Sequence, residues 1–512
     1  MENKTPAVAM RDITKTFGTT VANDRVWLDI YRGEILALLG ENGSGKTTLM
    51  NMLSGIYFPD AGTIAVDGRE VVIRSPKDAF DLGIGMIHQH FKLVDVFTAA
   101  ENIVLGLKEP GKLDMKAAGA KIRAICETYG FDVDPDQKVY DMSVSQKQTV
   151  EIVKVLYRGA DILILDEPTA VLTPQETDKL FAVLRNMRSD GKAVVIITHK
   201  VHEVEELSDR VAVLRHGQFV GDMLTKETDA QEMTNMMVGH AVTLNIERPE
   251  PEDPKPRIEV KDLKVRSIDG ILKLEDVSFT ANSGEILGIA GISGCGQKEL
   301  LEAIAGLQPV ESGAIDYVND DGSREPLLGQ DPLSIAEKGV VLSFVPEDRL
   351  GMGLVGSMDL TDNMMLRSYR RGRGPFLDRV FPRHRAEWVV DELDVATPGI
   401  TTPVRRLSGG NVQKVLVGRE IASAPKVLLT AYAVRGLDIG ASHMIYDMIN
   451  LQKEKGVAVI YVGEDLDVLL ELSDRILVLC GGKVSGIVDG RHTSKREVGL
   501  MMTKLGGGTE HE

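Results

Sequence analysis

Gly40-Glu41-Asn42-Gly43-Ser44-Gly45-Lys46-Thr47 lies between an apolar strand-length segment, Glu34 to Leu39, and a helix-like segment, Thr47 to Leu53. A phosphate-binding loop requires this order of strand, glycine-rich turn and helix. Glycines let the backbone curl so that its N–H groups face phosphate oxygens, and the helix start adds partial positive charge. We expect Lys46 to reach the β- and γ-phosphates and the Thr47 hydroxyl to bind Mg²⁺. The stretch predicts a site that binds and hydrolyses ATP.

Two further strand-like segments end in side chains suited to phosphate chemistry. Ile162 to Leu165 is followed by Asp166 and Glu167. We expect Asp166 to hold Mg²⁺, and Glu167 to orient and polarise the attacking water. Ala193 to Thr198 is followed by His199, for which we expect a contact with the γ-phosphate.

A glutamine occurs in the segment Met86 to Phe91. The side-chain carbonyl of Gln89 is placed to reach both Mg²⁺ and the attacking water. The flanking His88 and His90 suggest a metal pair, but the sequence offers no evident third ligand. We therefore interpret these two histidines as packing or polar contacts.

Bulk composition limits the class of protein. The chain has 512 residues, too many for one core, with 43% hydrophobic and 26% charged residues and a formal net charge of −17. The acidic balance argues against a nucleic-acid partner. The three cysteines form no C-x-x-C pair, and the apolar runs are strand-length. We therefore expect a location on the cytoplasmic side, without a segment that crosses the membrane.

The sequence contains two copies of one domain. Gly-Glu-Ile-Leu at Gly33 to Leu36 recurs at Gly284 to Leu287, and Ser208-Asp209-Arg210 recurs as Ser473-Asp474-Arg475. Residue 40 corresponds to residue 291, an offset of 251, and residue 208 corresponds to residue 473, an offset of 265. A repeat this long indicates duplicated domains, each mixing strand and helix patterns in an α/β fold.

A proline-rich acidic stretch, Arg248 to Pro256, separates the copies and has the composition of a short semi-rigid linker. The predicted boundaries are residues 8–245 for the first domain, 246–257 for the linker and 258–505 for the second domain.

The phosphate loop, the glutamine, the strand-end Asp-Glu and the strand-end His are joined in the second copy by Leu407-Ser408-Gly409-Gly410-Asn411. Together they resemble the ATP-binding cassette (ABC) family, of which Leu-Ser-Gly-Gly is the signature. The resemblance implies two tandem P-loop NTPase domains, each with a mixed-sheet core and a helical subdomain, packed head to tail. The signature of one cassette then closes over ATP held by the loop of the other, and Phe17 stacks on adenine.

The two copies have lost complementary elements. In the second loop Gln297 and Lys298 replace the lysine and the threonine, and the 265-residue offset turns Asp166, Glu167 and His199 into Ala431, Tyr432 and Glu464. In the first copy Met142 to Gln146 lacks both signature glycines, and Thr173 stands where the second copy has Asp438.

Head-to-tail pairing explains this sorting, because it leaves one complete site and one site degenerate on both faces. The degenerate site, with some phosphate contact from Lys298, is expected to hydrolyse ATP slowly or not at all.

The expected ligands are ATP and Mg²⁺, and the candidate site residues fall into three groups. The catalytic residues are Glu167, His199 and Gln89. The metal ligands are Thr47, Gln89 and Asp166. The nucleotide-binding residues are Phe17, Gly40, Glu41, Asn42, Gly43, Ser44, Gly45, Lys46, Thr47, Thr48, Ser408, Gly409, Gly410, Asn411 and Asp438.

One intact and one decayed cassette resemble the ATPase subunit of bacterial ABC importers for sugars and nucleosides. Pro346 to Arg349 also matches that group, and His88 to Phe91 with Thr98 to Asn102 most resembles the purine-nucleoside branch. The resemblance implies two integral-membrane permease subunits, an extracellular solute-binding lipoprotein and a peripheral position on the cytoplasmic membrane face.

Three alternatives remain at this stage. The first is a sugar importer ATPase. The second is a soluble tandem ATPase acting on ribosomes or nucleic acid, which the short linker, the acidic charge and the ruined site disfavour. The third is a non-catalytic scaffold, which conflicts with the complete first copy.

Overall fold

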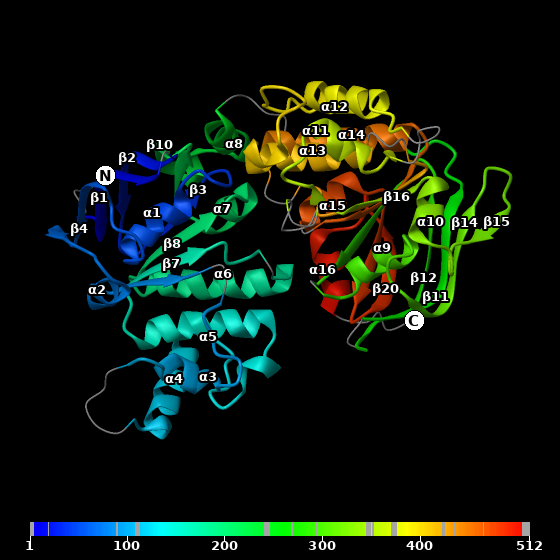
Figure 1. Cartoon of the computed structure of the whole chain (residues 1–512). Coiled ribbons are helices and arrows are strands. Elements are labelled where there is room, and N and C mark those ends of the chain that lie inside the picture. The colour runs from blue at the N-terminus through cyan, green and yellow to red at the C-terminus, as the bar shows by residue number, and fades with distance from the viewer. Residues whose placement is uncertain are drawn as a thin grey trace. The chain divides into compact units, whose positions relative to one another are not determined.

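The computed structural model divides the chain into two compact units, Met1–Leu244 and Asn245–Glu512 (Figure 1). It describes residues 5–18, 20–88, 91–107, 113–170, 172–239, 246–267, 270–292, 294–344, 350, 353–369, 376–421, 425–434, 437, 439–463 and 465–503.

Unit 1 contains two sheets flanked by helices. Its strands are β1 (Val8–Phe17), β2 (Thr20–Ile30), β3 (Ile35–Leu39), β4 (Ala61–Val66), β5 (Arg69–Val71), β6 (Ile84–Ile87), β7 (Ile162–Asp166), β8 (Ala193–Thr198), β9 (Arg210–Arg215) and β10 (Gln218–Leu224). Its helices are α1 (Lys46–Leu53), α2 (Pro76–Asp81), α3 (Ala99–Val104), α4 (Met115–Tyr129), α5 (Val144–Tyr157), α6 (Pro174–Ser189), α7 (Val201–Leu207) and α8 (Ala230–Val238).

The larger sheet of unit 1 places the predicted site. Its order is β10-β9-β3-β8-β7-β6, and its strands are parallel except for β10. Strands β3, β7 and β8 are buried along their whole length, which explains their uninterrupted apolar sequences. Since parallel strands end at one edge, Leu39, Asp166 and Thr198 leave the sheet together. The smaller sheet, β2-β1-β4-β5, is antiparallel.

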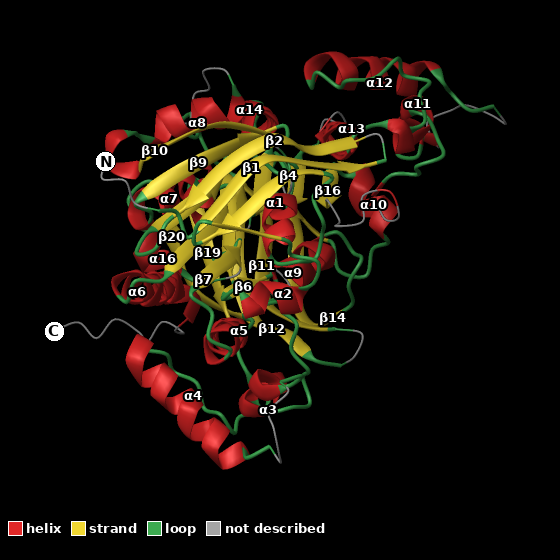
Figure 2. Cartoon of the chain, turned by 90° about the vertical axis from the view of Figure 1, so that its left-hand side faces the viewer, coloured by secondary structure: helices red, strands yellow, loops and turns green. Residues whose placement is uncertain are grey.

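The helices α3, α4 and α5 form one group in unit 1, in which α3 and α4 lie away from the sheets (Figures 1 and 2) and α5 packs on the larger sheet through Leu156. They share their own apolar cluster, which includes Ile103, Ile122 and Val150. This part is the predicted helical subdomain.

Unit 2 repeats the arrangement. Its strands are β11 (Pro256–Arg266), β12 (Leu272–Asn282), β13 (Ile286–Gly291), β14 (Val310–Val318), β15 (Arg324–Pro326), β16 (Val340–Phe344), β17 (Val427–Ala431), β18 (Ala458–Val462), β19 (Arg475–Cys480) and β20 (Lys483–Asp489). Its helices are α9 (Gln297–Ile304), α10 (Pro332–Glu337), α11 (Leu360–Met365), α12 (Val380–Glu392), α13 (Gly409–Ile421), α14 (Ile439–Glu454), α15 (Leu466–Leu472) and α16 (Lys495–Thr503).

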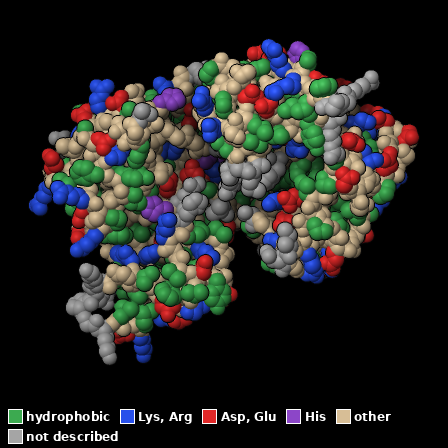
Figure 3. Space-filling view, viewed as in Figure 1, with side chains coloured by type: hydrophobic (Ala, Val, Ile, Leu, Met, Phe, Trp, Pro, Cys, Tyr) green, Lys and Arg blue, Asp and Glu red, His purple; other side chains and the backbone are tan. Residues whose placement is uncertain are grey.

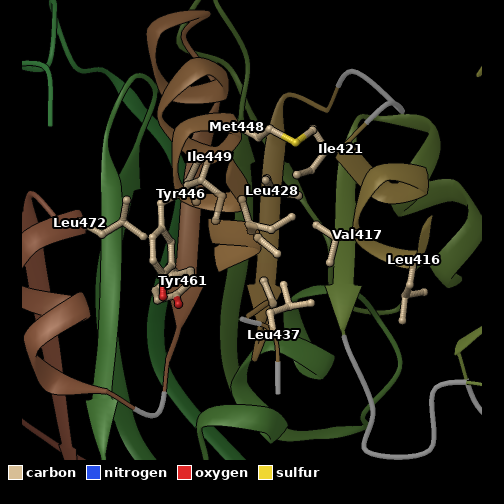
Figure 4. Packing of buried hydrophobic residues seen from close by; sticks show 14 of the residues in the cluster. Leu416, Val417, Ile421, Leu428, Leu437, Tyr446, Met448, Ile449, Tyr461 and Leu472 are labelled. Carbon is tan, nitrogen blue, oxygen red and sulfur yellow. The ribbon is translucent and has the colours of Figure 1, made fainter. Parts of the chain in front are cut away.

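The sheet orders of unit 2, β12-β11-β14-β15 and β16-β17-β18-β13-β19-β20, match those of unit 1. The predicted α/β class and the duplication are therefore confirmed. One core difference matters below: Tyr446 of α14 and Tyr461 of β18 lie side by side among apolar side chains, with their hydroxyl groups together (Figure 4).

The stretch predicted as a linker packs on unit 2 where the structure describes it. The Arg248 guanidinium donates to the carbonyl oxygen of Leu470 at 2.9 Å, and the Lys453 ammonium donates to the carbonyl oxygen of Pro249. Lys453 also pairs with Asp474 at 2.8 Å, and both side chains are buried. These contacts attach residues 248–249 to the second unit.

Charged side chains cover much of the surface that Figure 3 shows. Side chains of both charge signs are interspersed over the visible face of each unit (Figure 3). Among the described residues, no helix combines the length and the apolar character needed to cross a membrane.

Candidate functional site

The loop Gly40–Thr47 connects β3 to α1, within one residue of the predicted strand and helix boundaries. Its backbone requires glycine at Gly45, where φ is 96° and a Cβ atom would lie 2.3 Å from the carbonyl oxygen of Ala22. A Cβ atom on Gly40 would lie 2.3 Å from the carbonyl oxygen of Leu214. The sequence therefore has glycine where the curled loop packs against neighbouring backbone.

Lys46 lies inside this loop. Its side chain is buried, and Nζ donates to the carbonyl oxygens of Gly40 at 2.6 Å and Glu41 at 2.8 Å. Burial lowers the pKa of Lys46 to about 8, against the opposing effect of nearby carboxylates. The Ser44 hydroxyl is buried without a hydrogen-bond partner among the described residues. A buried cation and an orphaned hydroxyl in one glycine loop fit the phosphate groups of ATP.

Asp166 faces the start of α1. The Thr47 hydroxyl lies 3.3 Å from Oδ1 of Asp166. Burial raises the pKa of Asp166 to about 6, although the Thr47 hydrogen bond opposes this shift. A divalent cation would favour the ionised carboxylate, and hydroxyl and carboxylate oxygens suit Mg²⁺, which keeps further positions for phosphate and water. These two residues therefore fit Mg²⁺. Among the described residues, no cluster of three His, Cys, Asp or Glu side chains offers an alternative metal site.

Glu167 and His199 meet across the ends of β7 and β8. Oε1 of Glu167 lies 3.0 Å from Nδ1 of His199. Because an ionised carboxylate only accepts hydrogen bonds, Nδ1 carries the proton in this contact. The backbone of Glu167 is left-handed, with φ of 46°, and its N–H donates to the carbonyl oxygen of Ile197 at 3.0 Å.

The charge state of Glu167 follows from its neighbours. Burial raises the pKa of this carboxyl group, but the hydrogen bond and charge of His199, with the charges of Lys46 and Lys200, outweigh burial and lower it overall. Glu167 is thus held ionised, as a proton acceptor must be.

Gln89 lies outside the described residues, as does His90. The strand that precedes it, β6, pairs in parallel with β7, with Ile87 opposite Leu165. Strand β6 therefore ends at the sheet edge that carries Asp166. After the gap, the N–H of Lys92 donates to the buried carboxylate of Glu151 at 2.6 Å.

Phe17 ends β1 with 44% of its surface exposed. Its ring packs edge-on against Tyr57 with centroids 5.2 Å apart, and Nζ of Lys15 lies 5.6 Å from the ring centroid. The ring is therefore accessible for the adenine stacking that the resemblance implies.

Unit 2 keeps the backbone of the site but not its chemical groups. Tyr432 has φ of 58° and donates its N–H to the carbonyl oxygen of Val462 at 3.0 Å, as Glu167 does to Ile197. Ala431 ends β17 in the position of Asp166. Gln297 is buried in the place of Lys46 and donates to the carbonyl oxygen of Ile292 at 3.3 Å. Nζ of Lys298 lies 3.6 Å from Glu302. Glu464 lies outside the described residues.

The serine before α13 differs from its equivalent before α5. Oγ of Ser408 accepts from Nδ2 of Asn411 at 2.8 Å. In unit 1, Ser143 and Gln146 form a reciprocal capping box. A Cβ atom on Gly410 would meet nothing within 4 Å, so packing within unit 2 does not require glycine there. Asp438 lies outside the described residues.

Sequence reasoning missed Glu203, Thr169 and Thr198. Oε2 of Glu203 accepts from the Thr198 hydroxyl at 3.1 Å, and Oε1 accepts from the Thr169 hydroxyl. The signal was available, since the 265-residue offset turns these positions into Val468, Val434 and Gly463.

Comparison with known proteins agrees with the geometry. The family model described as ABC transporter matches residues 24–170 and again residues 274–430. The nucleoside import ATP-binding protein NupA of Lactococcus lactis is 43% identical over 98% of this chain and 99% of its own length. The guanosine import ATP-binding protein NupO of Bacillus subtilis is 41% identical, over 99% of this chain and 98% of its own. The glucose import ATP-binding protein TsgD13 of Haloferax volcanii is 40% identical, over 98% of this chain and 96% of its own.

A solved structure of similar fold is the RNase-L inhibitor, with a TM-score of 0.59 over 91% of this chain and 87% of its own. Its sequence is only 16% identical, so the likeness concerns the fold alone.

Proposed function

The chain belongs to the ABC transporter family of ATP-binding proteins, and from this premise we propose that it hydrolyses one ATP per cycle at unit 1 to energise solute import. The observation that carries the proposal is the convergence of Lys46, Asp166, Glu167 and His199 at one sheet edge of unit 1. The equivalent groups of unit 2 are absent.

In the proposed chemistry each of these residues has its own role. Lys46 and the loop N–H groups would bind the β- and γ-phosphates. Thr47 and Asp166 would hold Mg²⁺, which would supply positive charge beside the phosphate oxygens. Glu167 accepts a proton from the attacking water. His199 orients Glu167 through Nδ1 and contacts the γ-phosphate. The side-chain carbonyl of Gln89 would reach both Mg²⁺ and the attacking water.

We further propose that Ser408, Gly409, Gly410 and Asn411 bind the γ-phosphate of ATP held by the loop Gly40–Thr47, with Asp438 beside them. The glycine at position 410 supports this, because packing within unit 2 does not require it and a ligand that approaches the backbone does. Nδ2 of Asn411 donates to Oγ of Ser408, which keeps both side chains at the helix start.

Ser408→Ala should lower ATP turnover about 10- to 100-fold, because it removes a donor to the transferred phosphate. The matched control is Ser143→Ala, which removes a helix cap worth about 1 kcal/mol and should leave turnover unchanged. Steady-state hydrolysis and thermal melting of both variants check the two expectations. Equal turnover losses in both would contradict the assignment.

We propose nucleosides as the solute class, with two integral-membrane permeases and an extracellular solute-binding lipoprotein as partners and a peripheral position on the cytoplasmic membrane face. The names of two relatives, NupA and NupO, support nucleosides. The name of a third, TsgD13, favours the alternative of a sugar, since its identity of 40% is almost as high.

Deletion of the gene that encodes this chain should reduce cellular uptake of labelled guanosine or adenosine to background. It should leave uptake of glucose and ribose unchanged. The wild-type chain should restore nucleoside uptake, and Glu167→Gln should not. Loss of sugar uptake with intact nucleoside uptake would favour the alternative. Failure of the chain to co-purify with any membrane protein would argue against an importer of either kind.

A further inference from the structure

A buried carboxylate joins the two segments that carry Glu167 and His199. Glu203 of α7 is buried, and its Oε1 accepts from the Thr169 hydroxyl while its Oε2 accepts from the Thr198 hydroxyl at 3.1 Å. Nζ of Lys200 lies 3.3 Å from Oε1 of Glu203. Each oxygen of the carboxylate is therefore paired, as burial of a charge requires.

The two threonines lie next to the reacting groups along the chain. Thr169 follows Glu167 by two residues, and Thr198 directly precedes His199. The Thr198 hydroxyl also accepts the backbone N–H of Lys200 at 3.1 Å. One carboxylate thus fixes the backbone on both sides of the contact between Glu167 and His199.

We propose that Glu203 is a positioning residue for ATP hydrolysis, holding Glu167 and His199 in register through Thr169 and Thr198. The inference rests on the proposed function of Glu167 and His199 and names a third residue on which their geometry depends. Glu203 itself does not touch the nucleotide in this role.

Unit 2 provides an internal comparison, because the same strands and helix occur there without the chemistry. Glu203, Thr169 and Thr198 become Val468, Val434 and Gly463. Val434 and Val468 pack against the apolar core of unit 2. The fold therefore does not need a carboxylate at this place, so its presence in unit 1 calls for another reason.

Gly463 shows how completely the arrangement has been replaced. A Cβ atom at this position would lie 2.7 Å from the ring of Tyr461, the tyrosine that lies beside Tyr446 in the core (Figure 4). A threonine like Thr198 has no room there. The polar cluster is present where Glu167 and His199 are present and is absent where both are replaced.

The physical effect follows from the burial of Glu203 and the two threonines. Hydrogen bonds to a buried charge are strong and directional, so the cluster restricts the two segments more than apolar packing would. A displacement of about 1 Å between a catalytic base and its partner reduces turnover about 100-fold. Loss of the cluster should therefore lower the rate of hydrolysis and leave nucleotide affinity nearly unchanged.

The first test compares Glu203→Gln with Glu205→Gln, the same substitution at an exposed position of the same helix. In the full chain, Glu203→Gln should lower kcat about 10- to 100-fold while changing KM for ATP less than about threefold. Glu205→Gln should match the wild type. Thr169→Val and Thr198→Val should each lower kcat. Thr169→Ser and Thr198→Ser, which keep the hydroxyl, should have the kcat of the wild type.

The second test asks whether Glu203 acts through His199. Adding Glu203→Gln to His199→Ala should lower kcat much less than it does in the wild type, because the contact between Glu167 and His199 that Glu203 holds in register is already gone. The proposal would be overturned if the kcat losses of His199→Ala and Glu203→Gln multiply in the double variant. Equal kcat for Glu203→Gln and Glu205→Gln would also overturn it. Wild-type turnover that survives Glu167→Gln would instead overturn the assignment of the base.

A structural readout covers the case in which turnover is too slow to measure. The double variant Glu203→Val with Thr169→Val copies the apolar pair that unit 2 accommodates, so it should fold. Its crystal structure should show Oε1 of Glu167 and Nδ1 of His199 beyond hydrogen-bond distance. A contact still near the present 3.0 Å would overturn the positioning role.

Discussion

Glu167→Gln should reduce ATP hydrolysis by at least about 100-fold while ATP still binds. Glutamine has nearly the shape of glutamate, so the side chain should stay within reach of His199, now 3.0 Å away. It has no basic oxygen, however, and cannot take a proton from water. Steady-state hydrolysis and fluorescent-nucleotide binding measure the two expectations separately.

The matched control is Tyr432→Phe, the equivalent position in unit 2, which has the same left-handed backbone and the same hydrogen bond to the neighbouring strand. Its turnover should equal that of the wild type, because the second site already lacks Asp and Glu. Undiminished hydrolysis by Glu167→Gln would contradict the assignment of Glu167 as the base. A large loss in Tyr432→Phe would show that the second site contributes to turnover.

Motifs with a strict residue pattern were predictable from the sequence. The loop Gly40–Thr47 and the buried strands before Asp166 and His199 have the observed boundaries within a residue, because uninterrupted apolar runs and a glycine turn have few other solutions. The replacements in unit 2 were also readable, since the 265-residue offset matches equivalent strands and helices.

Contacts that depend on three-dimensional packing were not predictable. Nothing in the sequence around Glu167 indicates its left-handed backbone, which follows from a hydrogen bond to Ile197 on a strand about thirty residues later in the chain. The same holds for the bond between buried Gln148 and the carbonyl oxygen of Pro168, repeated in unit 2 by Gln413 and Ala433. Such pairs can be recognised only once α5 and β7, or α13 and β17, are placed side by side.

The two units separate what the fold requires from what the chemistry requires. Gln148 and its bond to Pro168 persist in unit 2, whereas Lys46, Asp166, Glu167 and Glu203 do not. The contact of Gln148, kept in both units, serves the architecture, and a polar feature found only in unit 1 is a candidate for a role in hydrolysis. This comparison within one chain is the basis for choosing variants that should fold yet lose activity.

Lys46→Gln should have the second large effect, because it gives the first loop the glutamine that the second loop has at Gln297. Gln297 shows that the loop accepts glutamine: it is buried at the start of α9, and Gly296 before it has φ of 100°, close to the 96° of Gly45. The variant should therefore fold with unchanged thermal stability. Its loop loses the buried cation of Lys46, a charge that glutamine does not replace.

We expect ATP affinity and turnover of Lys46→Gln each to fall by about 100-fold or more, measured by calorimetry and steady-state hydrolysis. The reverse change, Gln297→Lys, should not add a second hydrolytic site, because Ala431 cannot bind a metal and Tyr432 is a poor base at neutral pH. Turnover in Gln297→Lys above that of the wild type would contradict the proposal of a single working site. Undiminished ATP binding in Lys46→Gln would contradict the role assigned to Lys46, since the N–H groups of the loop would then suffice for the phosphates.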